Sequence, residues 1–281
     1  MMGSDITGGI HVVLAFAVLA LITTTGRIFA RRETKNTLRL SDWINIIDAV
    51  VNLALCTAIE RLSVNIEPNM LNQADISSKL QIIGQVVPTA LIGTSKISVL
   101  LFYKEIFDIW KFRVTANVLI AVSALWTIVF FFLELFIRDP TYRPSPGSEF
   151  APLRWDDGSM WASAVSIDIA LDIAIVALPI PVLLGLHMEL RRKILILGMF
   201  LLGALVTVAS AARLYYIVKT YVDEDRSVLA GSPEAYLGFA ASNIQAIVWS
   251  FIETSISIIA ASLPLLVPLF RHRSCSRYRH T

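Results

Sequence analysis

The chain has 281 residues, of which 56% are hydrophobic and only 16% are charged, and its mean hydropathy is +0.67. Soluble domains carry about 25% charged residues, so this composition is typical of a polytopic membrane protein and excludes a large soluble core. The formal net charge of +2 says little about partners. The basic tail is typical of a segment beside a membrane surface, so we expect it to contact lipid and no nucleic acid.

Seven apolar stretches follow one another along the chain, separated by short charged loops. They cover about residues 9–30, 42–62, 80–103, 114–137, 160–186, 194–221 and 242–270. Each is near or above the roughly 20 residues that a helix needs to cross the hydrocarbon core. Helices are the expected form, because a bilayer leaves backbone groups no other partners except in a closed barrel. We therefore predict an all-α membrane protein, with residues 1–281 forming a single seven-helix transmembrane bundle.

Lysine and arginine in the loops predict the orientation of this bundle. The first, third and fifth loops and the tail together hold fifteen basic residues, whereas the amino terminus and the remaining loops hold seven. Basic loops stay on the cytosolic side, so we predict the N-terminus outside and the C-terminus in the cytosol. The same three basic loops are where a cytosolic partner would bind.

Seven ionisable side chains lie within the predicted spans, where lipid is a poor solvent for charge. They are Asp48, Lys96, Glu134, Asp168, Asp172, Arg213 and Glu253. Each Asp, Lys or Arg that faced lipid at mid-depth would cost about 2.5–3.5 kcal/mol. Seven such residues would cost on the order of 20 kcal/mol, more than the net stability of a typical protein. We therefore expect them to face the bundle interior, to pair with one another or to hold a proton.

Helical rise places two cations and three carboxylates of this set in one layer. Lys96 and Asp172 lie near mid-membrane, and Asp168 lies one turn further out. Arg213 and Glu253 fall in the outer half of their spans. We predict that the aspartates are counter-ions of the two cations. Because two carboxylates one turn apart repel each other, one of them is a candidate to hold a proton.

Trp249 lies one turn before Glu253 on the same helix face, and it completes the candidate site. The site is either an interhelical clamp or an outward-facing polar pocket for a small apolar or mixed ligand. A membrane cyclase or isomerase that protonates its substrate would use Asp172, Glu253 and Trp249, and a proton-coupled transporter would use the same carboxylates. We favour ligand binding and assign no catalytic residue. The four histidines show no metal-ligand spacing, so no metal is expected.

Four stretches of the chain carry a family resemblance. They are RIFARR followed by SDW, then TSKISVLLFYKEIF, then the long run from DIALDIAIVALPIP to VTVASAARL, and AIVWSFIETSISIIAASLPLL. In this order they resemble the fungal rhodopsin-like integral membrane proteins, a group with receptor-like members and members encoded in secondary-metabolite clusters. The resemblance implies seven helices in a plasma membrane or endomembrane. It makes Lys96, Asp172, Arg213, Trp249 and Glu253 positions of the family pattern.

The chain also departs from that pattern. Ser41-Asp42-Trp43 stands where the family usually has a paired acidic start before the aromatic. Asp168 stands where Asn is frequent, and Glu105 where Arg is frequent. The outer cysteines of the loop between the fourth and fifth spans are absent and the tail is short. The resemblance therefore implies neither an ordered outer loop nor signalling through the tail.

A rhodopsin-like family raises the question of retinal. A retinal protein needs a Schiff-base lysine, which rhodopsins place in the seventh helix. Residues 242–270 contain no lysine, and Lys96 would carry a Schiff base only in a different arrangement. We therefore expect no retinal and no other cofactor.

Overall fold

The computed structural model is built of α-helices, and no strand occurs in the residues that it describes, which are 2–33, 39–64, 70–107, 109–136, 157–181, 190–230 and 245–262. The helices are α1 (Met2–Glu33), α2 (Leu40–Val64), α3 (Met70–Ile106), α4 (Trp110–Phe136), α5 (Asp157–Ala177) and α7 (Leu190–Ala230). A last helix, Gln245–Ser262, is called helix 245–262. Within these ranges, seven helices are long and apolar enough to cross a membrane. The prediction of seven membrane-spanning helices is confirmed, and the orientation of the termini stays a prediction.

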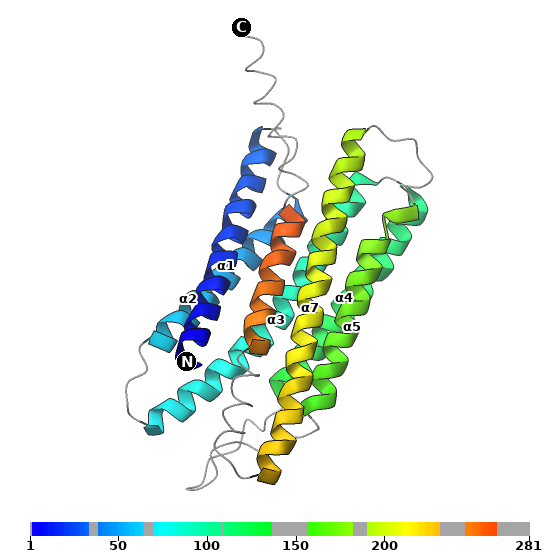
Figure 1. Cartoon of the computed structure of the whole chain (residues 1–281). Helices are drawn as coiled ribbons and strands as arrows, with labels where there is room; N and C mark the ends of the chain where they lie inside the picture. Colours follow the sequence, from blue (N-terminus) through cyan, green and yellow to red (C-terminus); the bar gives the residue numbers. More distant parts are fainter. Residues whose placement is uncertain are drawn as a thin grey trace.

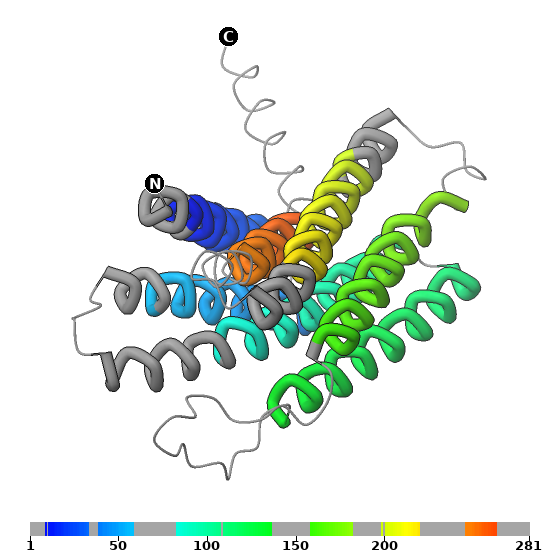
Figure 2. Tube along the Cα trace, turned by 60° about the horizontal axis from the view of Figure 1, so that its bottom comes forward, coloured from blue at the N-terminus to red at the C-terminus, as the bar shows by residue number. Residues whose placement is uncertain are grey.

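The helices pack side by side as a bundle (Figure 1). α1 packs on α2, α2 on α3, α3 on α4, and α5 on α7. Helix 245–262 runs parallel to α1, because Gly9 lies against Val248 and Arg27 bonds to Ala261 further along both helices. Viewed nearly along the bundle, helix 245–262 fits between α1 and α7 (Figure 2).

Two helices form the centre of the bundle. In their membrane-crossing stretches, 67% of the residues of α3 and 61% of those of helix 245–262 are buried, against 39% or less in each of the other five. α4 is the opposite case, since Val118, Leu125 and Phe132 expose their apolar side chains. Acyl chains would solvate such a surface. Charged side chains that lie against these two helices are therefore the ones screened from lipid.

Proline and glycine adjust the helices locally. α5 ends at Ala177, two residues before Pro179, because the residue before a proline disfavours the helical conformation. This is earlier than the predicted end near residue 186, and residues 182–189 lie outside the described ranges.

A Cβ on Gly203 of α7 would overlap Val176 of α5. The glycine therefore lets these two helices approach closely, which positions the polar contacts between them.

A buried charge cluster as the candidate functional site

Five charged side chains from four helices meet inside the bundle. This inner cluster consists of Lys96 of α3, Asp168 and Asp172 of α5, Arg213 of α7 and Glu253 of helix 245–262. Each of the five residues is at most 5% exposed. All are positions that the sequence placed in one layer, and the structure brings all five together.

Lys96 joins α3 to α5. Its Nζ lies 2.9 Å from Asp168 Oδ1 and donates a hydrogen bond of 3.1 Å to the backbone carbonyl of Asp168. It also donates to Asp172 Oδ1 in a short ion pair. Two of the three donors of this ammonium group thus go to the carbonyl of Asp168 and to Asp172, and the contact with Asp168 Oδ1 is an ion pair.

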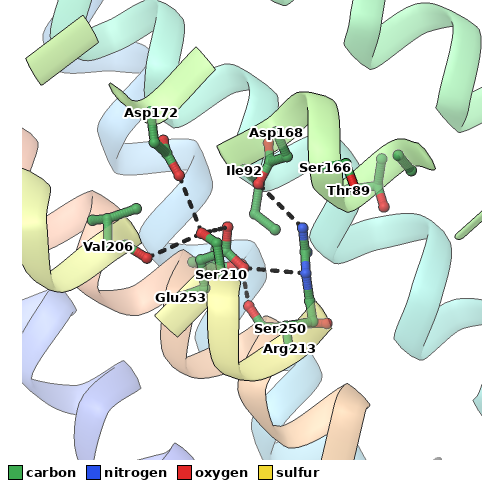
Figure 3. Close-up of polar contacts among 12 residues, drawn as sticks. Thr89, Ile92, Ser166, Asp168, Asp172, Val206, Ser210, Arg213, Ser250 and Glu253 are labelled. Atoms are coloured by element: carbon green, nitrogen blue, oxygen red, sulfur yellow. Dashed lines mark hydrogen bonds and ion pairs between the residues drawn. The ribbon is translucent and has the colours of Figure 1, made fainter. Parts of the chain in front are cut away.

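Arg213 joins α7 to α5 and to helix 245–262. Its Nη2 lies 3.1 Å from Asp168 Oδ2, and its Nε lies 3.3 Å from Glu253 Oε2 (Figure 3). Asp168 therefore has one cation on each of its two oxygens. The carboxylate of Glu134 in α4, which accepts a 2.8 Å hydrogen bond from Thr89, also attracts Arg213. Glu134 is only 3% exposed, so its side chain lies in the bundle interior.

Ser210 of α7 lies between two of the carboxylates. Its Oγ contacts both of them (Figure 3), at 3.1 Å from Asp172 Oδ2 and 2.8 Å from Glu253 Oε1. It is also 3.0 Å from the backbone carbonyl of Val206. No pattern in the sequence singled out this serine, because its importance depends on how α7 is rotated against its neighbours.

A small cavity adjoins the inner cluster at Lys96 and Asp172, with a volume of about 40 Å³. One water needs about 10–15 Å³ of such space, so the cavity has room for a few water molecules. Its far wall includes Tyr103 and Ala261. These residues lie further along α3 and helix 245–262, towards the ends that the loop charges predict to be cytosolic. The outward-facing pocket predicted from the sequence stays a prediction.

Trp249 packs against an apolar cluster built from α1, α2 and its own helix, which consists of Val13, Ala17, Cys56, Phe251 and Ile252. A role for Trp249 in ligand binding stays a prediction.

Neutral polar pairs join α2 and α3 to helix 245–262 along a second interior surface, the polar seam. Its pairs are Asn45 with Ser262 (3.1 Å), Asn52 with Ser255 (2.9 Å) and Ser95 with Ser257 (2.8 Å). Asp48 lies in the same region, 3% exposed, and accepts a 2.8 Å hydrogen bond from Thr94. The polar face of α2 thus finds partners inside the bundle.

A second charge cluster, which the sequence analysis did not predict, lies where α1 ends and α2 begins. This end cluster consists of Arg27, Arg31, Arg39, Asp42 and Glu105. Asp42 pairs with Arg27 Nε at 2.6 Å and with Arg31 Nε at 3.1 Å. Glu105 Oε2 pairs with Arg31 at 2.8 Å and with Arg39 at 3.4 Å. These contacts hold α1, α2 and α3 together.

Helix length explains why the end cluster was missed. Arg27 and Arg31 were both counted among the basic residues of the first loop, but α1 continues past the predicted end near residue 30 to Glu33. Both arginines lie in the helix and are 0% and 4% exposed. Arg27 also donates to the carbonyl of Ala261 and to Ser41. Ser41 in turn lies 3.4 Å from Glu105. Two departures from the family pattern, Ser41 and Glu105, are therefore in contact.

The helices, their apolar surfaces and the charges sheltered between them define a multi-pass membrane protein. Residues 26–272 match the family described as the fungal rhodopsin domain, so the chain belongs to that family, and the resemblance predicted from the sequence is confirmed. No solved structure gives a significant match to the chain.

Two curated relatives extend the comparison. The chain is 22% identical over 269 residues to Receptor GIN3 of Arthrobotrys oligospora, covering 92% of this chain and 61% of the relative. It is 26% identical over 196 residues to the Phomoidride biosynthesis cluster protein H of a fungal species, covering 65% of this chain and 49% of the relative. The matches thus cover between about half and three fifths of the relatives' own lengths.

Proposed function

We propose that this fungal rhodopsin-like membrane protein is a receptor-like or secondary-metabolite-pathway accessory protein that binds a small apolar or mixed ligand within the membrane. The observation that carries the proposal is the inner cluster, in which four helices are held by charges that are almost fully buried. The names of the two relatives, a receptor and a biosynthesis cluster protein, support the same two roles.

The inner cluster has the properties of an element with two states. Lys96 ties α5 to α3, whereas Arg213 and Ser210 tie α7 to α5 and to helix 245–262. Packed interiors shift between discrete arrangements and do not deform continuously. A ligand that moved one of these helices would make the buried ion pairs exchange partners. The ends of the helices would then change position. A cytosolic partner at the basic loops would detect that change.

Thermal stability of the purified protein in lipid nanodiscs tests this proposal. We expect members of a panel of terpenes, polyketides and fatty acids to raise the melting temperature of the wild-type protein. Val206→Trp, which places an indole in the cavity beside Lys96, should abolish the shift if the ligand enters there and preserve it if the ligand binds on the outward side. Turnover of a panel member that is lost in Asp172→Asn would replace the receptor-like role with the cyclase or isomerase alternative.

Retinal provides a separate test of the ligand class. We infer that Lys96, which is held by Asp168 and Asp172, forms no Schiff base. Adding all-trans-retinal to the purified protein should therefore produce no new absorption band in the visible range. A band that disappears in Lys96→Met would show that this inference is wrong.

A further inference from the structure

The inner cluster contains more acid than base. Asp168, Asp172 and Glu253 face Lys96 and Arg213, so the formal charge with every group ionised is 2 − 3 = −1. Glu134 on α4 attracts Arg213 but accepts its own hydrogen bond from Thr89, so it is counted outside this balance. An uncompensated charge away from water is strongly unfavourable. The cluster therefore favours the uptake of one positive charge.

The hydrogen bonds of Ser210 show where that charge fits. A serine hydroxyl has a single proton to donate, yet its Oγ lies within hydrogen-bond distance of Asp172 Oδ2 and Glu253 Oε1. If both carboxyls were ionised, at least one of these contacts would bring two acceptor oxygens together without a hydrogen between them. A proton on either carboxyl satisfies both contacts, because that carboxyl donates to Ser210 while Ser210 donates to the other.

The third carboxylate is held differently. Asp168 has Lys96 on one oxygen and Arg213 on the other. Asp172 and Glu253 each have one cation on one oxygen and Ser210 on the other oxygen. Two flanking cations favour the ionised form of Asp168. Glu253 also contacts the carboxylate of Asp168, and because Asp168 keeps its charge, this contact favours a proton on Glu253. The proton thus belongs on the pair that the serine connects.

We propose that the chain binds one proton in the inner cluster, shared between Asp172 and Glu253 through the hydroxyl of Ser210. In the transfer, the O–H bond of protonated Glu253 breaks as its proton bonds to Ser210 Oγ. The serine's own proton passes to Asp172 Oδ2, so Ser210 stays neutral and one negative charge moves from Asp172 to Glu253. Asp172 lines the cavity, which has room for water. The site therefore exchanges its proton through Asp172, with Ser210 as the relay and Glu253 as the inner end.

This proton site stands independently of the ligand-binding role and gives the inner cluster two electrostatic arrangements. With the proton on Glu253, the negative charge lies on Asp172 beside Lys96 and strengthens the contact between α3 and α5. With the proton on Asp172, the charge lies on Glu253 beside Arg213 and strengthens the contact between α7 and helix 245–262. The position of one proton thus biases the packing of four helices.

Infrared spectroscopy of the full chain in nanodiscs at neutral pH tests the proposal. The wild-type spectrum minus that of Glu253→Gln should show the carbonyl band of a protonated carboxylic acid, because the variant balances two cations with two acids. The matched control, wild type minus Glu134→Gln, should show no such band. Any band from Asp48 in the polar seam is common to these samples and cancels. Loss of the band in Glu134→Gln, with retention in Glu253→Gln, would overturn the proposal.

A second measurement requires no change at the two acids. Ser210→Ala removes the partner of the protonated carboxyl, so the acid carbonyl band should shift in frequency. Separate ¹³C labelling of aspartate and glutamate in the wild type assigns the band to one or both residue types. An acid spectrum unchanged by Ser210→Ala would overturn the shared proton. The same follows if the band appears in choline chloride but vanishes in sodium chloride, because a metal cation would then supply the missing charge.

Discussion

The inner cluster and the end cluster are opposites in charge. The inner cluster has three acids and two bases, all at most 5% exposed, whereas the end cluster has three bases and two acids. The extra base of the end cluster, Arg39, has a side chain that is 55% exposed. Water therefore solvates the surplus charge at the end of the bundle. The surplus in the interior meets no more than the few waters that the cavity beside Asp172 can hold, which is why we assign it a proton.

Removing a cation from the inner cluster should have the largest effect. Lys96→Met leaves Asp172 without its cation in the interior, and breaking a buried ion pair in this way costs about 3–5 kcal/mol. Unfolding by titration with sodium dodecyl sulfate would measure the loss. Lys104→Met is the matched control, because Lys104 donates to Asn117 at an exposed site, and it should change stability by less than about 1 kcal/mol. Equal losses in the two variants would show that Lys96 is not a buried counter-ion.

Arg27→Met should have an intermediate effect. Arg27 is 0% exposed and supplies donors to Asp42, Ser41 and the carbonyl of Ala261. Asp42 keeps Arg31 as a partner, so the loss is that of unsatisfied buried groups, about 1–3 kcal/mol. The same detergent titration measures it. A loss as large as that of Lys96→Met would show that Arg31 does not compensate for the absence of Arg27 at Asp42.

Arg39→Met should have the smallest effect, although Arg39 pairs with the same Glu105 carboxylate as Arg31. Its side chain is largely in solvent, and exposed ion pairs contribute about 0–1 kcal/mol. We expect a shift in the titration midpoint close to the experimental error. A marked destabilisation would mean that the end cluster is as sheltered as the inner one, and the contrast between the two would disappear.

The sequence predicted the seven helices and the depth of the inner charges, because hydropathy and helical rise depend on position along the chain alone. It did not predict which face each residue presents. Trp249 shares a helix face with Glu253 yet packs against an apolar cluster, and Ser210 gains its role from the rotation of α7. The rotation of a helix about its axis depends on how it packs against its neighbours, and the sequence of one span alone does not determine that packing.

The end cluster was missed for a different reason. Basic residues near the end of a span were interpreted as orientation signals, and that interpretation does not consider whether they are also buried. The RIFARR and SDW stretches matched the family pattern, which was a usable signal. The structure shows that both stretches supply side chains to one network of ion pairs.

A double-mutant cycle on Lys96 and Asp172 tests most directly whether opposite charges from different helices meet inside the bundle. The unfolding free energy would be measured for the wild type, Lys96→Met, Asp172→Asn and the double variant. If the two side chains form the buried ion pair, the double variant loses less than the sum of the single losses, with a coupling of about 0.5–3 kcal/mol. Losses that add to within about 0.3–0.5 kcal/mol would mean that the two residues act independently, and the inner cluster as described would not exist.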